Sequence, residues 1–392
     1  MKLTVIGFGQ CGGRIADEFA KLNARARAKR RVEITPGVFA VNTDSADLSG
    51  LKHIRSDFRH RILIGIKKTG GHGVGKINEL GAEIAKDDSD KVIEAIRQTR
   101  RFYETDAFLL IAASGGGTGS GALPIMTRII KERYADKPVF DLIVLPFEHE
   151  ESTEERTIYN TALCLKAANS VANAVFLVDN QRYIKKDSSL ASNIAKINSL
   201  IAEPFYDILC AGEATKSSYI GTKTLDAGDI AQTLSGWTVI GYGQSDIPKI
   251  DLSFFKKNDF KSKSTQTYKG IQAMEQAISE LSLACRPADA RRALYLLSAP
   301  ANEMNVGLAK ELGEYLRSLA PKAIIRNGDY PSKRDNLSVH IILSELGSVD
   351  KVKNYYSKTV ELIPEFQRRQ EEKEISLKGL EEASKDIPSL LD

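Results

Sequence analysis

The stretch Ile111-Ala112-Ala113-Ser114-Gly115-Gly116-Gly117-Thr118-Gly119-Ser120-Gly121 decides the fold. The apolar residues before it, 106–110, are typical of a buried parallel strand, and the apolar spacing of residues 122–130 predicts a helix. Glycine-rich backbone costs conformational entropy on folding, so this loop needs a reason to exist. At a helix N-terminus its bare N–H groups favour a polyanion, and Thr118 and Ser120 add hydroxyl donors. We therefore expect a phosphate-binding loop and not a flexible turn.

Length and composition indicate a globular protein of the cytoplasm. The chain has 392 residues, 42% of them apolar, which is enough for two or three domains. No apolar run is long enough to span a bilayer, and the first predicted strand begins at residue 3 without a signal-peptide layout. The four cysteines lie far apart, which argues against a zinc site or a disulfide framework. Because a net charge of +4 is small, we expect no nucleic-acid partner, and we expect no membrane insertion.

Strands alternate with helices through the first half of the chain. This alternation predicts a doubly wound, mostly parallel α/β sheet, in which ligands bind at the carboxyl ends of the strands. The predicted strands are residues 3–6, 37–41, 61–65, 106–110, 139–146 and 174–178. The loops that follow them place Gly7, Asn42, Gly71, Gly115, Pro146 and Asp179 along one rim. We expect this rim to hold phosphates, a metal ion and a base.

Two other glycine motifs suggest different functions. Gly7, Gly9 and Gly12 satisfy G-x-G-x-x-G, which alone is weak support for an NAD-dependent oxidoreductase. The acid that should bind the ribose about 20 residues later is missing, because Asp44 lies well beyond that distance. Residues 70–77 nearly match a P-loop, but Ile77 stands where the magnesium-binding hydroxyl should be, which argues against a Walker-type NTPase. Lys76 is equally consistent with a phosphate contact and with a solvated loop lysine.

The second half of the chain predicts a long helix followed by an α+β domain. The helix covers about residues 189–210, is apolar on more than one face, and contains Pro204, which should bend or restart it. Outside this helix we expect helices at 77–103, 156–171, 267–282 and 306–319, an acidic loop at 147–156, a polar insertion at 211–223, strands at 293–298, 323–326 and 337–342, and a charged helical tail from 364.

The ordered set of motifs resembles the tubulin and FtsZ GTPases. Residues 115–121 are close to the signature loop of that family, and each further family loop has a counterpart in the expected order. The counterparts are Gly9-Gln10-Cys11-Gly12, Asn42-Thr43-Asp44, Gly71-His72-Gly73-Val74-Gly75, Pro146-Phe147 with Glu150, Asp179-Asn180 and Leu225-Asp226-Ala227-Gly228-Asp229. The third of these, with residues 78–83 and 210–213, is most similar to the archaeal CetZ group. The resemblance is strong over residues 1–240.

This resemblance implies a site for GTP or GDP with Mg²⁺. The implied phosphate contacts are Gln10, Cys11, Gly12, Gly115, Gly116, Gly117, Thr118, Gly119 and Ser120, and the further implied nucleotide-binding residues are Gly9, Asn42, Gly71 and Gly73. Asp44, or else Asp47, would hold the magnesium through water. Glu150 would contact the ribose, with Glu151 and Glu154 as alternatives. Asn180 and Asn198 would read guanine, with Asn193 as the rival of Asn198, and Ile194 replaces the aromatic ring that usually stacks on the base.

The resemblance also implies how hydrolysis and assembly are linked. Asp226 and Asp229 would complete the site of the next subunit when identical chains stack head to tail, a contact that extends into an open filament. From the residues alone, both acids are also consistent with capping of the helix that begins near Ile230. The alternatives are an NAD(P)-dependent oxidoreductase and a nucleotide-binding scaffold that does not hydrolyse. A role in cell shape or division is implied, and the sequence leaves the partner of the tail unknown.

The resemblance divides the chain into a GTP-binding domain and a smaller α+β domain joined by a central helix, the tubulin/FtsZ fold. The boundaries that we predict are 1–188 for the GTP-binding domain, 189–212 for the central helix, 213–235 for the catalytic loop and the start of the next helix, 236–363 for the C-terminal domain and 364–392 for the tail.

Overall fold

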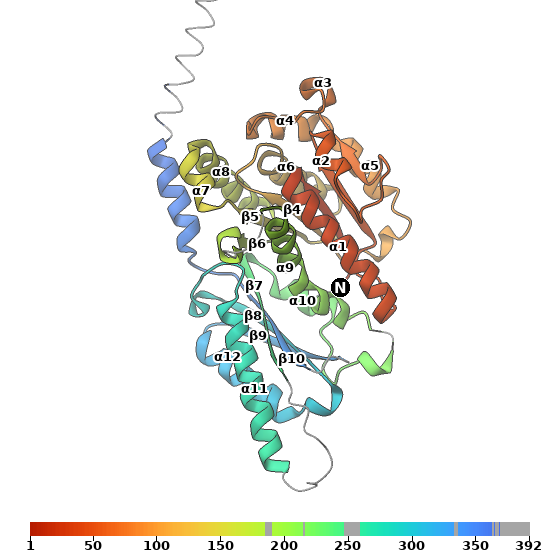
Figure 1. The fold of residues 1–392 in the computed structure, drawn as a ribbon, viewed down its shortest axis with the longest axis vertical. Helices are drawn as coiled ribbons and strands as arrows, with labels where there is room; N and C mark the ends of the chain where they lie inside the picture. Colours follow the sequence, from red (N-terminus) through yellow and green to blue (C-terminus); the bar gives the residue numbers. More distant parts are fainter. Residues whose placement is uncertain are drawn as a thin grey trace, which may run out of the picture.

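A ten-stranded sheet runs through the molecule (Figure 1). The computed structural model describes residues 1–184, 190–214, 216–246, 259–332, 336–362, 364 and 368. The strand order is β3-β2-β1-β4-β5-β6-β7-β10-β8-β9. The strands are β1 (Leu3–Phe8), β2 (Gly37–Asn42), β3 (Arg61–Leu63), β4 (Ala107–Ala113), β5 (Val139–Leu145), β6 (Ala174–Asp179), β7 (Gly236–Asp246), β8 (Arg292–Ala299), β9 (Ile324–Pro331) and β10 (Asn336–Ser344).

Strands β1 to β7 are mutually parallel where they pair, and β10 is antiparallel to both of its neighbours. The predicted doubly wound, mostly parallel α/β fold is therefore confirmed. β7 is the element that joins the two halves. Its first three residues pair with β6, and Val239–Asp246 pair with β10. The strand was not predicted, and it makes one continuous sheet of the two halves.

Helices cover both faces of the sheet. They are α1 (Gly9–Arg30), α2 (Ser45–Ser49), α3 (Ile66–Thr69), α4 (Asn78–Asp87), α5 (Ser89–Arg97), α6 (Thr118–Arg133), α7 (Glu148–Thr153), α8 (Glu155–Val171), α9 (Leu190–Ala211), α10 (Ala227–Thr233), α11 (Asp259–Ser279) and α12 (Val306–Leu319), with a further helix at 350–362. Alternate β4 residues enter different cores: Phe108, Leu110 and Ala112 pack with α6 and α8, while neighbouring β4 residues pack with α1 and α9. No helix in these described ranges is both long and apolar enough to cross a bilayer.

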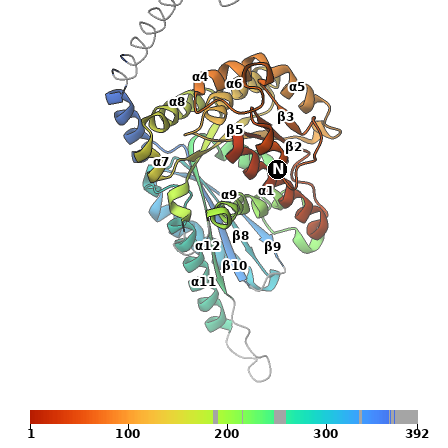
Figure 2. The same ribbon diagram turned by 45° about the horizontal axis from the view of Figure 1, so that its top comes forward.

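The predicted long central helix is confirmed as α9, which runs past Pro204 without restarting. It contacts α1 on one side and strands β7, β9 and β10 on the other. Figure 2 shows α9 between α1 and the part of the sheet that contains β8, β9 and β10. This two-sided contact explains why apolar residues appear on more than one face of its sequence.

Two predicted segments differ in detail from the structure. The helical stretch expected over 77–103 is divided into α4, α5 and a short 3₁₀ turn, because Asp88 leaves the helix and its carboxylate accepts a hydrogen bond from Gly65 N at 2.7 Å. The acidic loop expected over 147–156 contains helix α7, which begins where the Glu150 carboxylate accepts from Phe147 N at 2.9 Å. The predicted tail lies outside the described residues apart from 364 and 368, and the domain boundaries stay a prediction.

Glycines let the first helix approach the centre of the sheet. A Cβ on Gly12 would lie 2.1 Å from the carbonyl oxygen of Ile111 in β4, and a Cβ on Gly7 would lie 2.1 Å from Gly12 O. No side chain fits at such distances. The N-terminus of α1 therefore rests directly on the ends of β1 and β4, which fixes where its first N–H groups lie.

Gly12→Ala should destabilise the protein because the added methyl group overlaps a strand carbonyl. Overpacking of this kind costs about 1–3 kcal/mol, which should lower the thermal midpoint of the nucleotide-free protein by several degrees. Gly13→Ala is the matched control, since its Cβ would have Ala40 Cβ at 3.6 Å as nearest neighbour, an ordinary contact. A helical alanine is favoured over glycine by about 1 kcal/mol, so the control should be at least as stable as wild type. Equal midpoints for the two variants would contradict this packing.

Candidate functional site

A cavity of about 360 Å³ opens at the carboxyl ends of the parallel strands. It lies where open α/β sheets bind their ligands. Most of the predicted site residues line it: Gly9, Gln10, Cys11, Asn42, Asp44, Gly73, Gly115, Gly116, Gly117, Thr118, Gly119, Glu150, Asn180 and Asn198. Residues far apart in the sequence, from the loops after β1, β2, β4, β5 and β6 and from α9, therefore meet at one place.

Helices α1 and α6 both begin at this cavity, and neither N-terminus is capped by a side chain. Neither α1 nor α6 has a side chain that accepts from its first N–H groups, and neither has an acidic residue in its first turn. A Cβ on Gly9 would lie 3.2 Å from Gly119 N, so the two helix starts are adjacent, and a Cβ on Gly116 would have nothing within 4 Å. Uncapped N–H donors and the positive ends of two helix dipoles favour a multiply charged anion.

Asp47 organises the polar side of the cavity. Its carboxylate accepts from Gln10 Nε2 at 2.6 Å and from Asn42 Nδ2 at 3.0 Å. Asp44 instead caps α2, with Oδ1 accepting from Ala46 N at 2.9 Å and Asp47 N at 3.1 Å. Both carboxylates line the cavity. One or two carboxylates beside bound phosphates are the usual protein contribution to a Mg²⁺ site, so these residues fit that ion.

The loop at 70–76 reaches the cavity through a left-handed backbone. Gly71 and Gly73 have φ of 84° and 80°, and Gly73 N donates to Thr43 O at 3.1 Å. Gly73 lines the cavity, whereas Gly71 lies behind it and accepts from Ser45 N at 3.0 Å. Lys76 also lines the cavity, but its ammonium is paired with Glu154.

The three candidate acids of the sugar-binding loop lie in different surroundings. Glu150 lines the cavity. Glu151 accepts from Tyr355 Oη and lies 3.6 Å from Lys358 Nζ, in the helix at 350–362. Glu154 is the partner of Lys76. Glu150 is therefore the acid of this loop whose position suits a ligand in the cavity.

The predicted base-reading residues face the cavity from two elements. Asn180 follows β6, while Asn198 and Ile194 come from successive turns of α9. Asn198 is buried, 6% exposed, so its amide is directed into protein and cavity and not into bulk water. The rival Asn193 is not among the cavity-lining residues. Ile194 offers an apolar wall where the family resemblance leads one to expect an aromatic ring.

Three predicted nucleotide-binding residues lie outside the cavity lining. They are Gly12, packed on β4, Gly71, and Ser120, whose hydroxyl donates to Gly116 O just before α6. Their place in the structure is to shape the loops that do line the cavity. Their roles toward a ligand stay a prediction.

Sequence reasoning missed Asn160, which holds the glycine loops together. Asn160 is fully buried on α8, and its Nδ2 lies 2.9 Å from Lys76 O, 3.1 Å from Gly116 O and 3.3 Å from Gly115 O. Its signal is an amide within an apolar helix, because a buried amide needs partners. Arg14 and Thr157, which also line the cavity, were missed as well.

Asp226 and Asp229 lie at the far end of α9 from the cavity. A Cβ on Gly212, just past that helix, would lie 3.3 Å from Asp226 Cα. From Asn198 to the end of α9 at Ala211 the helix extends about 20 Å at 1.5 Å per residue. Figure 1 shows α10 at the lower end of α9. Asp226 caps α10, with Oδ1 accepting from Asp229 N at 2.8 Å, so its predicted capping role is confirmed.

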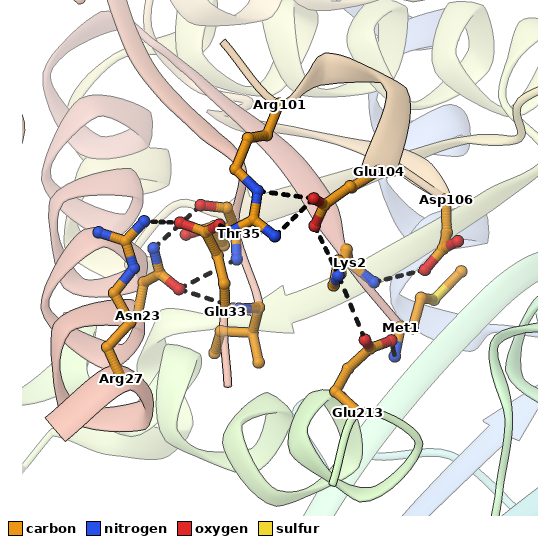
Figure 3. Close-up of polar contacts among 11 residues, drawn as sticks. Met1, Lys2, Asn23, Arg27, Glu33, Thr35, Arg101, Glu104, Asp106 and Glu213 are labelled. Atoms are coloured by element: carbon orange, nitrogen blue, oxygen red, sulfur yellow. Dashed lines mark hydrogen bonds and ion pairs between the residues drawn. The ribbon is translucent and has the colours of Figure 1, made fainter. Parts of the chain in front are cut away.

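The segment that leads to these acids starts at an ionic cluster (Figure 3). Glu213 Oε2 lies 3.6 Å from Lys2 Nζ, and Lys2 Nζ also donates to Glu104 at 2.7 Å. The carboxylate of Glu33 accepts from Arg101 at 2.7 Å and also pairs with Arg27. This cluster ties the end of α9 to β1 and to the turn before β4.

Comparisons with known proteins agree with this geometry. Residues 2–186 match the tubulin/FtsZ family GTPase domain, and residues 187–361 match the C-terminal domain of tubulin-like CetZ proteins. Tubulin-like protein CetZ1 of Haloferax volcanii is 31% identical over an alignment of 377 positions, which covers 92% of each chain. The chain belongs to the tubulin/FtsZ family, in its CetZ group. The predicted family and fold are confirmed.

Two solved CetZ structures share this fold. CetZ1 from Haloferax volcanii, a GDP-bound monomer, is 29% identical with a TM-score of 0.78, over 92% of this chain and 99% of that one. CetZ2 from the same organism, a GTPγS-bound protofilament, is 26% identical with a TM-score of 0.79, over 94% of this chain and 100% of that one.

Partial burial makes the Cys11 thiol, which lines the cavity, a weaker acid than a free cysteine. Removal from water, with a smaller contribution from the Glu150 carboxylate and against the effect of Arg14, raises the pKa of Cys11 to about 12. A thiolate is disfavoured in such surroundings, so Cys11 acts as a small, neutral wall residue.

We expect iodoacetamide to react with Cys11 about 10³-fold more slowly at pH 8 than with a free cysteine of pKa about 8.5, because the thiolate is the nucleophile. The rate should rise about tenfold per pH unit between pH 8 and pH 10 while the protein stays folded. Mass spectrometry of the Cys11 peptide gives the rate, and protein unfolded in guanidinium provides the unprotected control. Modification of native Cys11 within the time that a free thiol needs would contradict the raised pKa.

Proposed function

We propose that this protein binds and hydrolyses GTP and polymerises head to tail into cytoskeletal filaments. In such a filament the loop that carries Asp226 and Asp229, called the acidic loop from here on, would complete the site of the next subunit. One observation carries the proposal: the cavity and the acidic loop at Asp226 and Asp229 lie at opposite ends of α9. A single chain therefore holds both parts of a hydrolytic site too far apart to use together. Stacking of identical subunits would bring them into contact.

The cavity supports nucleotide binding. Its uncapped helix N-termini suit the phosphates of GTP or GDP, and the related CetZ structures contain GDP and GTPγS. We assign the phosphates to the loops at 9–12, 71–73 and 115–120, with Asn42. Asp44 would hold Mg²⁺ through water, with Asp47 beside it. Bound Mg²⁺ would neutralise charge on the phosphates.

The base and the sugar would occupy the other end of the cavity. The amides of Asn180 and Asn198 can both donate and accept, as the polar edge of guanine requires. Glu150 would accept from a ribose hydroxyl. Ile194 would contact the base by its apolar surface, so affinity would depend more on the amides than on stacking.

Hydrolysis requires positioning more than strong base chemistry. Phosphoryl transfer depends on in-line placement of water and on neutralisation of charge by metal and backbone donors. Asp229, with Asp226 beside it, would orient the attacking water from the neighbouring subunit. A head-to-tail contact is heterologous and continues into an open filament. The related CetZ2 structure, a GTPγS-bound protofilament, supports assembly of this kind.

The family supports a proposal for the cellular setting. We propose a cytoplasmic filament that acts in cell shape or division and in which each subunit binds further copies of the same chain. We also propose that the successive segments of the chain end at residues 188, 212, 235 and 363. The partner of the tail is left open.

GTP turnover per subunit, with Mg²⁺ present, should stay near zero at low protein concentration and rise above a threshold. Asp229→Ala should lower the turnover above that threshold about 10²-fold or more, since it removes the group that orients water. Asp90→Ala on α5 is the control, because Asp90 lies in neither the cavity nor the acidic loop. A constant turnover per subunit would contradict a shared site. Unchanged turnover in Asp229→Ala with intact filaments would show that hydrolysis does not depend on this residue, and would contradict its assignment as the group that orients the water.

Glu150→Gln should weaken GDP binding about tenfold, because a neutral acceptor replaces a charged one. Glutamine keeps an oxygen for Phe147 N, so helix α7 should persist. Glu151→Gln is the matched control, because Glu151 is the next residue in the sequence but accepts a hydrogen bond from Tyr355 outside the cavity. Calorimetric titration of the nucleotide-free protein measures both. Loss of affinity in Glu151→Gln alone would move the ribose contact to that residue.

A further inference from the structure

Strand β9 lies at the edge of the sheet and contacts the segment that leads to Asp226 and Asp229. Asp329 accepts from Thr222 N at 2.8 Å and from Lys223 N at 2.5 Å, and its own N–H donates to Lys223 O at 3.0 Å. A Cβ on Gly328 would lie 2.6 Å from Leu225 Cγ, so backbone and loop are in direct contact. The expected polar insertion at 211–223 is thus anchored in its last residues by an edge strand.

Arg326, two residues before Gly328 on β9, continues this contact to α10. Its Nε lies 3.4 Å from Asp229 Oδ1, and its Nη2 donates to Gln232 Oε1 at 2.6 Å. Asp229 and Gln232 are three residues apart and therefore lie on one face of the helix. A single guanidinium contacts both.

The orientation of Asp229 depends on contacts outside its own helix. Helix α10 has seven residues, too few to be stable alone, so its direction is set by what it packs on. The side chains of Asp229 and Arg326 are 42% and 26% exposed, and a pair so open to water contributes little to stability. The contact is thus better suited to aiming a carboxylate than to holding the fold.

We propose that Arg326 is a positioning residue for GTP hydrolysis, one that aims Asp229 at the nucleotide of the neighbouring subunit. The inference rests on the function proposed above. Arg326 needs no contact with GTP: it acts by limiting the rotation of α10 and of the Asp229 side chain. Because lysine presents one ammonium and no planar fork, it cannot reproduce both contacts.

Arg326→Gln should lower GTP turnover per assembled subunit about tenfold to hundredfold, the usual loss when a reacting group is misplaced by about 1 Å. The threshold concentration for assembly with GTPγS, measured by sedimentation, and the thermal midpoint should stay at wild-type values. Arg326→Lys should recover only part of the turnover. Arg317→Gln, which removes an exposed arginine from α12, is the control and should leave all three quantities unchanged.

Mixing variants tests the direction of the effect. Arg326→Gln has an intact cavity and a misaimed loop, whereas Asp44→Ala has the reverse. A mixture of the two should have a higher turnover per subunit than either variant alone, because loops from Asp44→Ala subunits meet cavities of Arg326→Gln subunits. A purely structural loss would show instead as a lower thermal midpoint and a higher assembly threshold, with no gain on mixing.

The outcomes separate this inference from the proposed function. Full turnover in Arg326→Gln alongside an inactive Asp229→Ala would overturn the positioning role and leave the shared site intact. A lowered midpoint together with a raised threshold would overturn it also. Turnover without a threshold in the wild type would instead overturn the proposed function on which the inference rests.

Discussion

The close approach of backbone to backbone at the carboxyl ends of β1 and β4 is the constraint on which this structure depends. Gly7, Gly12 and Gly119 each stand where a Cβ would meet main-chain atoms at 3.1 Å or less. Their absence of side chains lets α1 and α6 begin side by side against the sheet. Two sets of unpaired N–H groups then converge on one cavity, and the anion preference of the site follows from backbone geometry before any side chain is considered.

The parts of the site that the sequence could predict are those that depend on local conformation. A strand, a glycine loop and a helix are neighbours in the chain, so the loops at 9–12 and 115–121 could be found, and sheet topology brought them together. Asn198 could be placed from helical spacing. Asp47 as the partner of Gln10, or Asn160 as the link between two loops, could not be predicted, because these contacts join residues distant in sequence.

The differences between the predicted and observed elements have the same cause. The apolar spacing over 77–103 fits a helix, yet Asp88 leaves the helix and accepts a hydrogen bond from Gly65. The helix is therefore interrupted by a tertiary contact, which local propensity does not predict. β7 went unpredicted although it has the length of a strand, because its glycines at 241 and 243 weaken the pattern. Those glycines are needed for helix α11, since a Cβ at either position would lie within about 2 Å of carbonyl oxygens of Ala277 or Ala273.

Helix α9 sets the distance between the two functional ends of the chain. Arg30 on α1 and His340 on β10 both approach the buried Asp207, at 3.8 and 3.3 Å, so one carboxylate on α9 ties this helix to α1 and to β10. Removing one member of such a buried group leaves the others without compensation, which makes the arrangement costly to change. The helix is therefore a fixed spacer, with Asn198 at the cavity and Asp226 beyond its far end. This rigid spacing is the physical basis for our proposal that an acid of this loop serves the cavity of another copy of the chain, and Arg326 Nε lies 3.4 Å from the carboxylate of that acid, Asp229.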